Sequence, residues 1–66
     1  MESQIINFID HNTAMMASVH QRMDGRYIVH LDDLDSDLRV QPSRIFGDID
    51  KAAAYAKSLV NNGVAA

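Results

Sequence analysis

The chain lacks cysteine, and with it several ways of holding a small domain together. Disulfides, zinc–thiolate sites and thiol nucleophiles are all excluded from its 66 residues. A domain of this length buries only about 60% of the surface of its unfolded chain, so its stability margin is thin. Small secreted domains compensate with disulfides, and the composition therefore favours a reducing, cytoplasmic location. We expect self-association, as a homodimer, or another protein partner to supplement the core.

Three other shortages exclude classes of function. No apolar run approaches the roughly 20 residues of a membrane-spanning helix, and the opening MESQ lacks the basic stretch of a secretory signal, so we expect no membrane contact. The net charge of −3 argues against nucleic-acid binding, whose affinity comes largely from basic side chains. The two Phe and two Tyr are scattered, which leaves no stacking platform for single strands.

Hydrophobic residues make up 47% of the chain, enough for a folded domain, and their clearest pattern lies near the C-terminus. Six apolar residues recur there at helical spacing: Ile49, Ala52, Ala53, Ala56, Leu59 and Val60. Asp48 is placed to cap this helix and Gly63 to end it, which predicts a helix over residues 48–62. Its alanines allow a close approach to a flat support such as a sheet.

Two alternating segments, 13–22 and 26–34, predict a β-hairpin around Met23, Asp24 and Gly25. A two-residue loop would place the apolar residues of the two strands on opposite faces. A three-residue loop, with Gly25 in the left-handed position of a bulge, gathers them on one face. This loop gives three opposed pairs: Val19 with Val29, Ala17 with Leu31, and Gln21 with Tyr27. We therefore predict the three-residue loop.

A third strand is expected over residues 38–44 and completes a meander that spans residues 13–45. Leu38 and Val40 should face inward, and Pro42 should confine this strand to the sheet edge because proline cannot donate to a ladder. Ile45 and Phe46 should then fill the core beneath the helix. The predicted fold is a single α+β domain over residues 1–66, with a three-stranded antiparallel meander packed on one C-terminal helix.

The N-terminal segment, residues 1–12, fits two structures. Ser3 could cap a short helix that uses the three isoleucines Ile5, Ile6 and Ile9, and this interpretation is slightly favoured. Alternation of isoleucine with asparagine in the same segment is also typical of an edge strand.

The predicted register leaves an outer sheet face that nothing in the chain is long enough to cover fully. One interpretation is an ordinary solvated face. The other is an interface, because methionine and arginine are enriched at interfaces and Met16 and Ile28 would be exposed there. We predict that interface to comprise Met16, His20, Arg22, Arg26, Ile28, His30 and Arg39, with Ser18 among them.

No metal or cofactor site is predicted. His20 and His30 should be diagonal neighbours on the outer face, but two imidazoles are too few for a structural metal site. The acidic turn over residues 32–37 superficially suggests a calcium loop. Leu38 replaces the glycine and Arg44 the glutamate that such a loop requires, so a solvated turn is favoured.

No catalytic residue is predicted either, and we expect the chain not to be an enzyme. Ser18 and Ser36 lie outside any nucleophile-elbow motif, and the three glycines form no phosphate-binding loop. A small sheet with one helix also has no room for a deep pocket unless two subunits build it together.

These observations favour a small protein-binding module or inhibitor that acts through its exposed sheet face or edge. In its size and in its lack of a recognisable site, the chain resembles the accessory proteins with which phages and other mobile elements bind host machinery, anti-CRISPR proteins among them. The resemblance lies in these general features and in no sequence motif, and it implies inhibition of a host protein. The alternative is a nucleic-acid-binding accessory protein that uses a basic patch of Arg22, Arg26 and Arg39.

Overall fold

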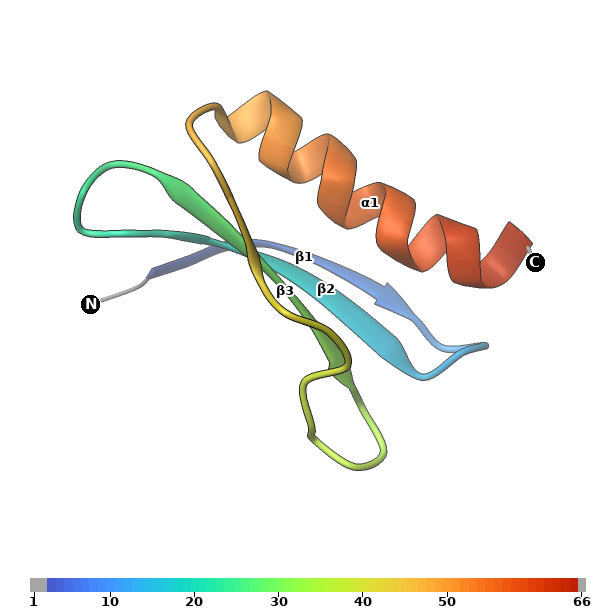
Figure 1. Cartoon of the computed structure of the whole chain (residues 1–66). Helices are drawn as coiled ribbons and strands as arrows, with labels where there is room; N and C mark the ends of the chain where they lie inside the picture. The colour runs from blue at the N-terminus through green and yellow to red at the C-terminus, as the bar shows by residue number, and fades with distance from the viewer. Residues whose placement is uncertain (1–2, 66) are drawn as a thin grey trace.

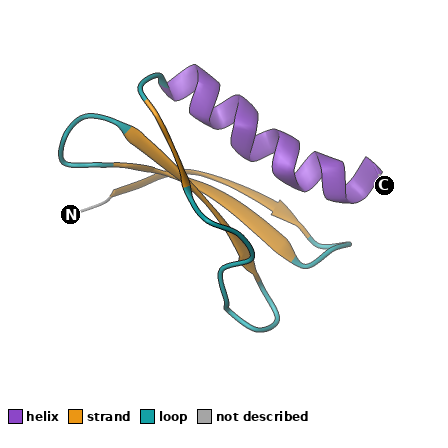
Figure 2. Ribbon diagram, viewed as in Figure 1, coloured by secondary structure: helices purple, strands orange, loops and turns teal. Residues whose placement is uncertain are grey.

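The computed structural model describes residues 3–65, and their side chains as far as residue 60. Its elements follow one another in the order β1 (Ser3–Asp10), β2 (Met15–Gln21), β3 (Tyr27–Asp33), β4 (Arg44–Phe46) and α1 (Ile49–Ala65). The strands form one antiparallel sheet in chain order, and α1 crosses one face of it (Figure 1, Figure 2). The α+β class and the C-terminal helix packed on an antiparallel sheet are confirmed.

The β2–β3 hairpin has the predicted register. All three expected pairs are present: Val19 with Val29, Ala17 with Leu31, and Gln21 with Tyr27. The loop is closed by the Arg22 amide, which donates to the Arg26 carbonyl at 2.7 Å, and by the Gly25 amide, which donates to the Arg22 carbonyl at 3.1 Å. Gly25 has a φ of 85°, the left-handed conformation that glycine adopts without strain. The three-residue loop is therefore confirmed.

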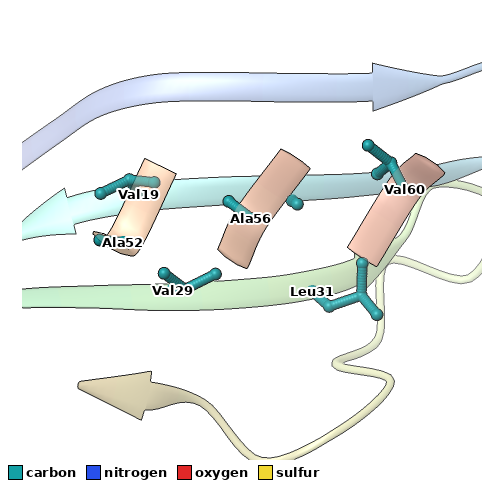
Figure 3. Packing of buried hydrophobic residues seen from close by; sticks show 7 residues of the cluster. Val19, Val29, Leu31, Ala52, Ala56 and Val60 are labelled. Atoms are coloured by element: carbon teal, nitrogen blue, oxygen red, sulfur yellow. The ribbon is translucent and has the colours of Figure 1, made fainter. Parts of the chain in front are cut away.

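The core lies between α1 and the face of the sheet that this register makes apolar (Figure 3). Its buried members are Ala17, Val19, Val29, Leu31, Ala52, Ala56 and Val60. Ala52 and Ala56 have no exposed surface, so the helix backbone itself lies close above the sheet. Half-buried residues from β1, β4 and α1 close the margins of this core, among them Phe8, Phe46 and Tyr55.

The helix begins where predicted and ends later than predicted. The Asp48 carboxylate accepts a hydrogen bond from the Asp50 amide at 2.8 Å, and the Asp48 carbonyl accepts one from the Ala52 amide at 3.0 Å. This geometry confirms the N-cap. The helix then continues past Gly63 to Ala65. A single glycine costs a helix only about 1 kcal/mol relative to alanine, which is not enough to end it.

The N-terminal segment is a strand, and the favoured short helix is wrong. β1 pairs with β2, with Ile6 opposite Val19 and Phe8 opposite Ala17. An isolated helix of this length is marginal in water, whereas pairing with β2 satisfies the backbone and brings Ile6 and Phe8 against the core. The sheet consequently has four strands rather than the expected three.

The predicted third strand over residues 38–44 forms only in part. Arg39 makes an isolated bridge, and the ladder with β3 resumes only at β4. Leu38 is 67% exposed and Val40 is 45% exposed, so neither is buried in the core. Pro42 has no amide to donate and interrupts the pairing between the bridge and β4.

Candidate functional site

We call the side of the sheet opposite α1 the outer face, and it contains the residues that alternate with the core residues. Its members on β2, β3 and β4 include Met16, Ser18, His20, Ile28, His30 and Ile45. Ile45 belongs to it because it lies opposite Ile28, and residues directly opposite each other share a face. The prediction that Ile45 fills the core is therefore wrong; the residue is 43% exposed, and only Phe46 packs against the core.

Two histidines meet at the centre of the outer face. His30 lies opposite Ser18 and His20 lies opposite Ile28, which makes the imidazoles diagonal neighbours, as predicted. Their ring centroids are 4.9 Å apart and the rings meet edge-on at 66°. His20 Nε2 is also 3.1 Å from the Ser18 hydroxyl, within hydrogen-bond distance. The two strands thus present one compact imidazole and hydroxyl cluster.

A second set of polar contacts links this cluster to the segment between β3 and β4. His30 Nδ1 is hydrogen-bonded to the Ser43 hydroxyl. Arg39 Nη1 donates to the same hydroxyl at 3.4 Å, and Arg39 Nε donates to Asp32 Oδ1 at 3.0 Å. The contacts form a continuous polar chain from the centre of the outer face to the end of β3.

Ser18 and His30 are as deeply buried as core residues, with exposures of 1% and 6%. Within the described residues no second layer lies over them, so their neighbours on the sheet produce this burial. Ser18 is flanked by Asn7 on β1 and by His30 on β3, and His30 is contacted by Ser43. Buried polar groups are costly unless they are hydrogen-bonded, and the polar chain provides these partners. The centre of the outer face is therefore an ordered surface.

Exposed isoleucines flank the polar centre at both edges of the sheet. Ile9 on β1 lies opposite Met16 and is 49% exposed, and Ile45 on β4 is 43% exposed. Ile5, in the β1 bulge, is 41% exposed. A polar centre with apolar margins gives a partner both directional contacts and area to remove from water.

The predicted arginines do not form one patch. Arg22, at the hairpin loop, lies 3.5 Å from Asp24 in an ion pair, and Arg26 follows in the same loop region. Arg39 is paired with Asp32, which is six residues, or about 20 Å of strand, from Arg26. The structure thus separates the two ends of the proposed basic surface.

Arg44 lies on the opposite side of the sheet, because it is paired with the core residue Val29. Its guanidinium carbon lies 5.3 Å from the centre of the Phe46 ring and 5.2 Å from that of Tyr55. These are cation–π distances, and they hold Arg44 at the margin between β4 and α1.

Sequence reasoning missed Asp32, Ser43 and Ile45 as members of the site. Asp32 could have been found, because it continues the two-residue alternation that begins with Ile28 and His30. Ser43 follows a proline in an irregular segment and carries no periodic signal. Its contact with His30 depends on how that segment folds back along β3.

In the acidic turn after β3, the Asp33 carboxylate is hydrogen-bonded within the turn. Asp33 Oδ1 accepts a hydrogen bond from the Asp35 amide at 2.9 Å, and the Asp33 carbonyl accepts one from the Asp37 amide at 2.8 Å. The first contact is typical of an Asx-type turn, and the second closes an α-turn. Within the described part of the chain, no group of three or more His, Cys, Asp or Glu side chains is placed to hold a metal ion.

Comparison of the chain with family models, with curated proteins and with solved structures finds no match. Among residues 3–65, no helix is both long and apolar enough to cross a membrane. The function proposed below therefore depends on the geometry of the chain itself.

Proposed function

We propose that the chain is a small protein-binding module that docks a partner protein on its outer face. The observation that carries this proposal is the ordered cluster of Ser18, His20 and His30 on a face that α1 leaves uncovered. A solvated face needs no buried polar centre, whereas an interface benefits from side chains whose positions are fixed before the partner arrives.

The composition of the outer face also fits a protein partner. Interface centres are depleted in charge and enriched in methionine and aromatic side chains, with hydrogen-bonding groups among them. The centre here combines two imidazoles with Met16 and Ile28, Ile45 lies at the sheet edge, and the charges of the described residues are confined to the two ends of the face. The ion pair of Arg39 and Asp32 lies at one end and Arg22 lies at the other.

Inhibition of the partner, an origin in a phage or other mobile element, and a cytoplasmic location are parts of the same proposal. Inhibition and origin rest on the resemblance of character to small accessory proteins. The location rests on the cysteine-free composition.

The test compares two double variants of the full chain. His20→Ser with Ile28→Ser changes the centre of the outer face, and Ala54→Ser with Lys57→Ser changes exposed residues of α1 as a matched control. A partner recovered from the native cell with the wild-type chain is purified, and its affinity for each variant is measured by calorimetry.

The proposal predicts that the outer-face variant binds at least tenfold more weakly, a loss of about 1.4 kcal/mol, while the control binds as the wild type does. Circular dichroism verifies that both variants are folded. Unchanged affinity in the outer-face variant would refute the proposal.

Nucleic-acid binding through Arg22, Arg26 and Arg39 remains the second candidate, with weaker support because the arginines are separated along the sheet. It predicts a mobility shift with DNA or RNA that weakens steeply between low and physiological salt. The absence of any shift at low salt would remove it.

A further inference from the structure

The two edges of the sheet differ in how well they are protected against pairing with another chain. β4 is only three residues long and follows Pro42, and short strands and prolines are common ways of blocking an edge. β1 is eight residues long and contains no lysine, arginine or proline. No other described strand pairs with its outer edge. β1 is therefore the edge at which another strand can add.

The hydrogen bonds of the β2–β3 hairpin determine which backbone groups of β1 point out from the edge of the sheet. The bond between the Arg22 amide and the Arg26 carbonyl fixes which residues of β2 face β3, because directions alternate along an antiparallel strand. Val19 and Ala17 consequently face β1, where they lie opposite Ile6 and Phe8. The amide and carbonyl groups of the intervening Asn7 and of Ile9 then point outward.

The sequence of β1 reads almost the same in both directions around Asn7. From Gln4 to Asp10 it runs polar, isoleucine, isoleucine, asparagine, phenylalanine, isoleucine, polar. If two copies of β1 pair in antiparallel orientation about Asn7, residues of similar chemistry lie opposite each other on both faces of the sheet. The opposed pairs are Asn7 with Asn7, Ile5 with Ile9, Ile6 with Phe8, and Gln4 with Asp10. Apolar residues thus meet apolar residues, and no two like charges lie opposite each other.

We propose that β1 pairs with β1 of a second copy of this chain, in antiparallel register about Asn7, to form a continuous eight-stranded sheet. The β1 bulge at Ile5 limits the regular pairing to residues 6–8, with Ile9 beside Ile5 of the second copy. Pairing covers the exposed side chains of Ile5 and Ile9 and satisfies the outward backbone groups of Asn7.

The helices leave room for this arrangement. The core residues under α1 come from β2 and β3 (Figure 3), so the helix lies about two strand spacings from the new two-fold axis. With strands about 4.8 Å apart, the two helices would run roughly 20 Å apart, well beyond the 8–10 Å of packed helices. Both helices lie on one side of the extended sheet, and the two outer faces form one surface on the other side. Self-pairing uses the β1 edge, whereas the proposed partner binds the outer face, so the two interactions use different parts of the molecule.

The absence of cysteine allows a direct test of the register. In the proposed dimer the two Asn7 Cα atoms are about 5.5 Å apart, which suits a disulfide. The two Ile9 Cα atoms are separated by four residues of strand, about 14 Å. Under mild oxidation, Asn7→Cys is expected to give a covalent dimer on a non-reducing gel, and Ile9→Cys, the matched control, is expected to remain a single chain. Equal cross-linking of both variants, or of neither, overturns the register.

A second experiment tests the edge itself by sedimentation of the cysteine-free chain. Ile9→Lys places a charge on the β1 edge, and Ile45→Lys makes the same change at a similarly exposed isoleucine of β4. The wild type and Ile45→Lys are expected to be dimers, and Ile9→Lys is expected to dimerise at least tenfold more weakly while retaining its circular dichroism spectrum. A monomeric wild type, or equal behaviour of the two variants, overturns the proposal.

Different results would refute the pairing through β1 and the binding of a partner on the outer face. The double variant His20→Ser with Ile28→Ser leaves the β1 edge intact and is expected to remain a dimer whatever its affinity for a partner. Loss of the dimer in this variant contradicts edge pairing through β1, and retained partner affinity in it contradicts only the outer-face function.

Discussion

The two faces of the sheet are built from alternate residues of the same strands, yet the buried side chains on each face are stabilised in different ways. On the inner face, apolar side chains such as Val19 and Val29 lie beneath a helix whose contacting residues are small. On the outer face, Ser18 and His30 are buried by their neighbours on the sheet and are held by hydrogen bonds. Burial on the inner face is stabilised by removing apolar area from water, whereas burial on the outer face is tolerable only because polar partners are present.

One loop decides which residues belong to which face. Because side chains alternate along a strand, a shift of one residue in the hairpin would exchange the two sets across the sheet. The left-handed conformation of Gly25 fixes the three-residue loop and therefore the sorting. Substitutions on either face, or in the loop between the strands, should therefore lower the free energy of unfolding by different amounts.

The largest loss is expected on the inner face from Leu31→Ala. Leu31 is 8% exposed and packs in the core, so truncation should cost about 3 kcal/mol through lost burial and a residual cavity. Leu38→Ala is the control, because Leu38 is 67% exposed and should change stability by less than about 0.5 kcal/mol. Urea titrations measure both. Similar losses in the two variants would contradict the assignment of Leu31 to the core.

A smaller loss is expected from enlarging one of the buried alanines between the helix and the sheet. Ala56 has no exposed surface, so Ala56→Leu should overpack the interface and cost about 2 kcal/mol. Ala54→Leu makes the same change on the exposed side of α1 and should be nearly neutral. Thermal unfolding followed by circular dichroism compares them. A neutral Ala56→Leu variant would mean that α1 does not lie close to the sheet.

In the loop between β2 and β3, Gly25→Ala is expected to lower the free energy of unfolding by about 1 kcal/mol. The reason is conformational, because no atom lies within 4 Å of an added Cβ but the φ of 85° disfavours alanine. Gly47→Ala is the control, since Gly47 also has open space around it and does not adopt a left-handed φ. Guanidinium titrations that show equal stability for the two variants would argue against the three-residue loop.

The smallest loss is expected on the outer face from Ser43→Ala. This change removes the hydroxyl that is hydrogen-bonded to His30 and that accepts from Arg39, and should cost about 0.5 to 1 kcal/mol. Ser36→Ala, in the exposed acidic turn, should have no measurable effect. Equal unfolding midpoints in urea for these two variants would show that the polar chain contributes nothing to the order of the outer face.

The elements that could be predicted are those whose hydrophobic pattern is long and has a single period. The helix and the hairpin carry long patterns of a single period, and Gly25 selects between the two possible loops. The isoleucines of β1 fit both a helical and a strand period, and only pairing with β2 decides between them. β4 is too short for a periodic signal, and the alternation of Leu38 with Val40 indicated a strand that Pro42 interrupts.

The candidate site was predictable to the same extent as the hairpin. The diagonal contact of His20 with His30 follows from the register alone and is confirmed. The contact of Ser43 with His30 and the separation of Arg39 from Arg22 depend on the path of residues 34–43, which have no regular pattern. Tertiary contacts decide that path, and local sequence does not encode it.

The most direct test of the two-faced sheet is a map of proton–proton contacts by nuclear magnetic resonance. The account predicts nuclear Overhauser cross-peaks from the Ala52 methyl group to the methyl groups of Val19 and Val29 (Figure 3), and none from the imidazole protons of His20 or His30 to the side chains of residues 49–60 in α1. A cross-peak between the His30 ring and the methyl group of Ala52 or Ala56 would contradict it.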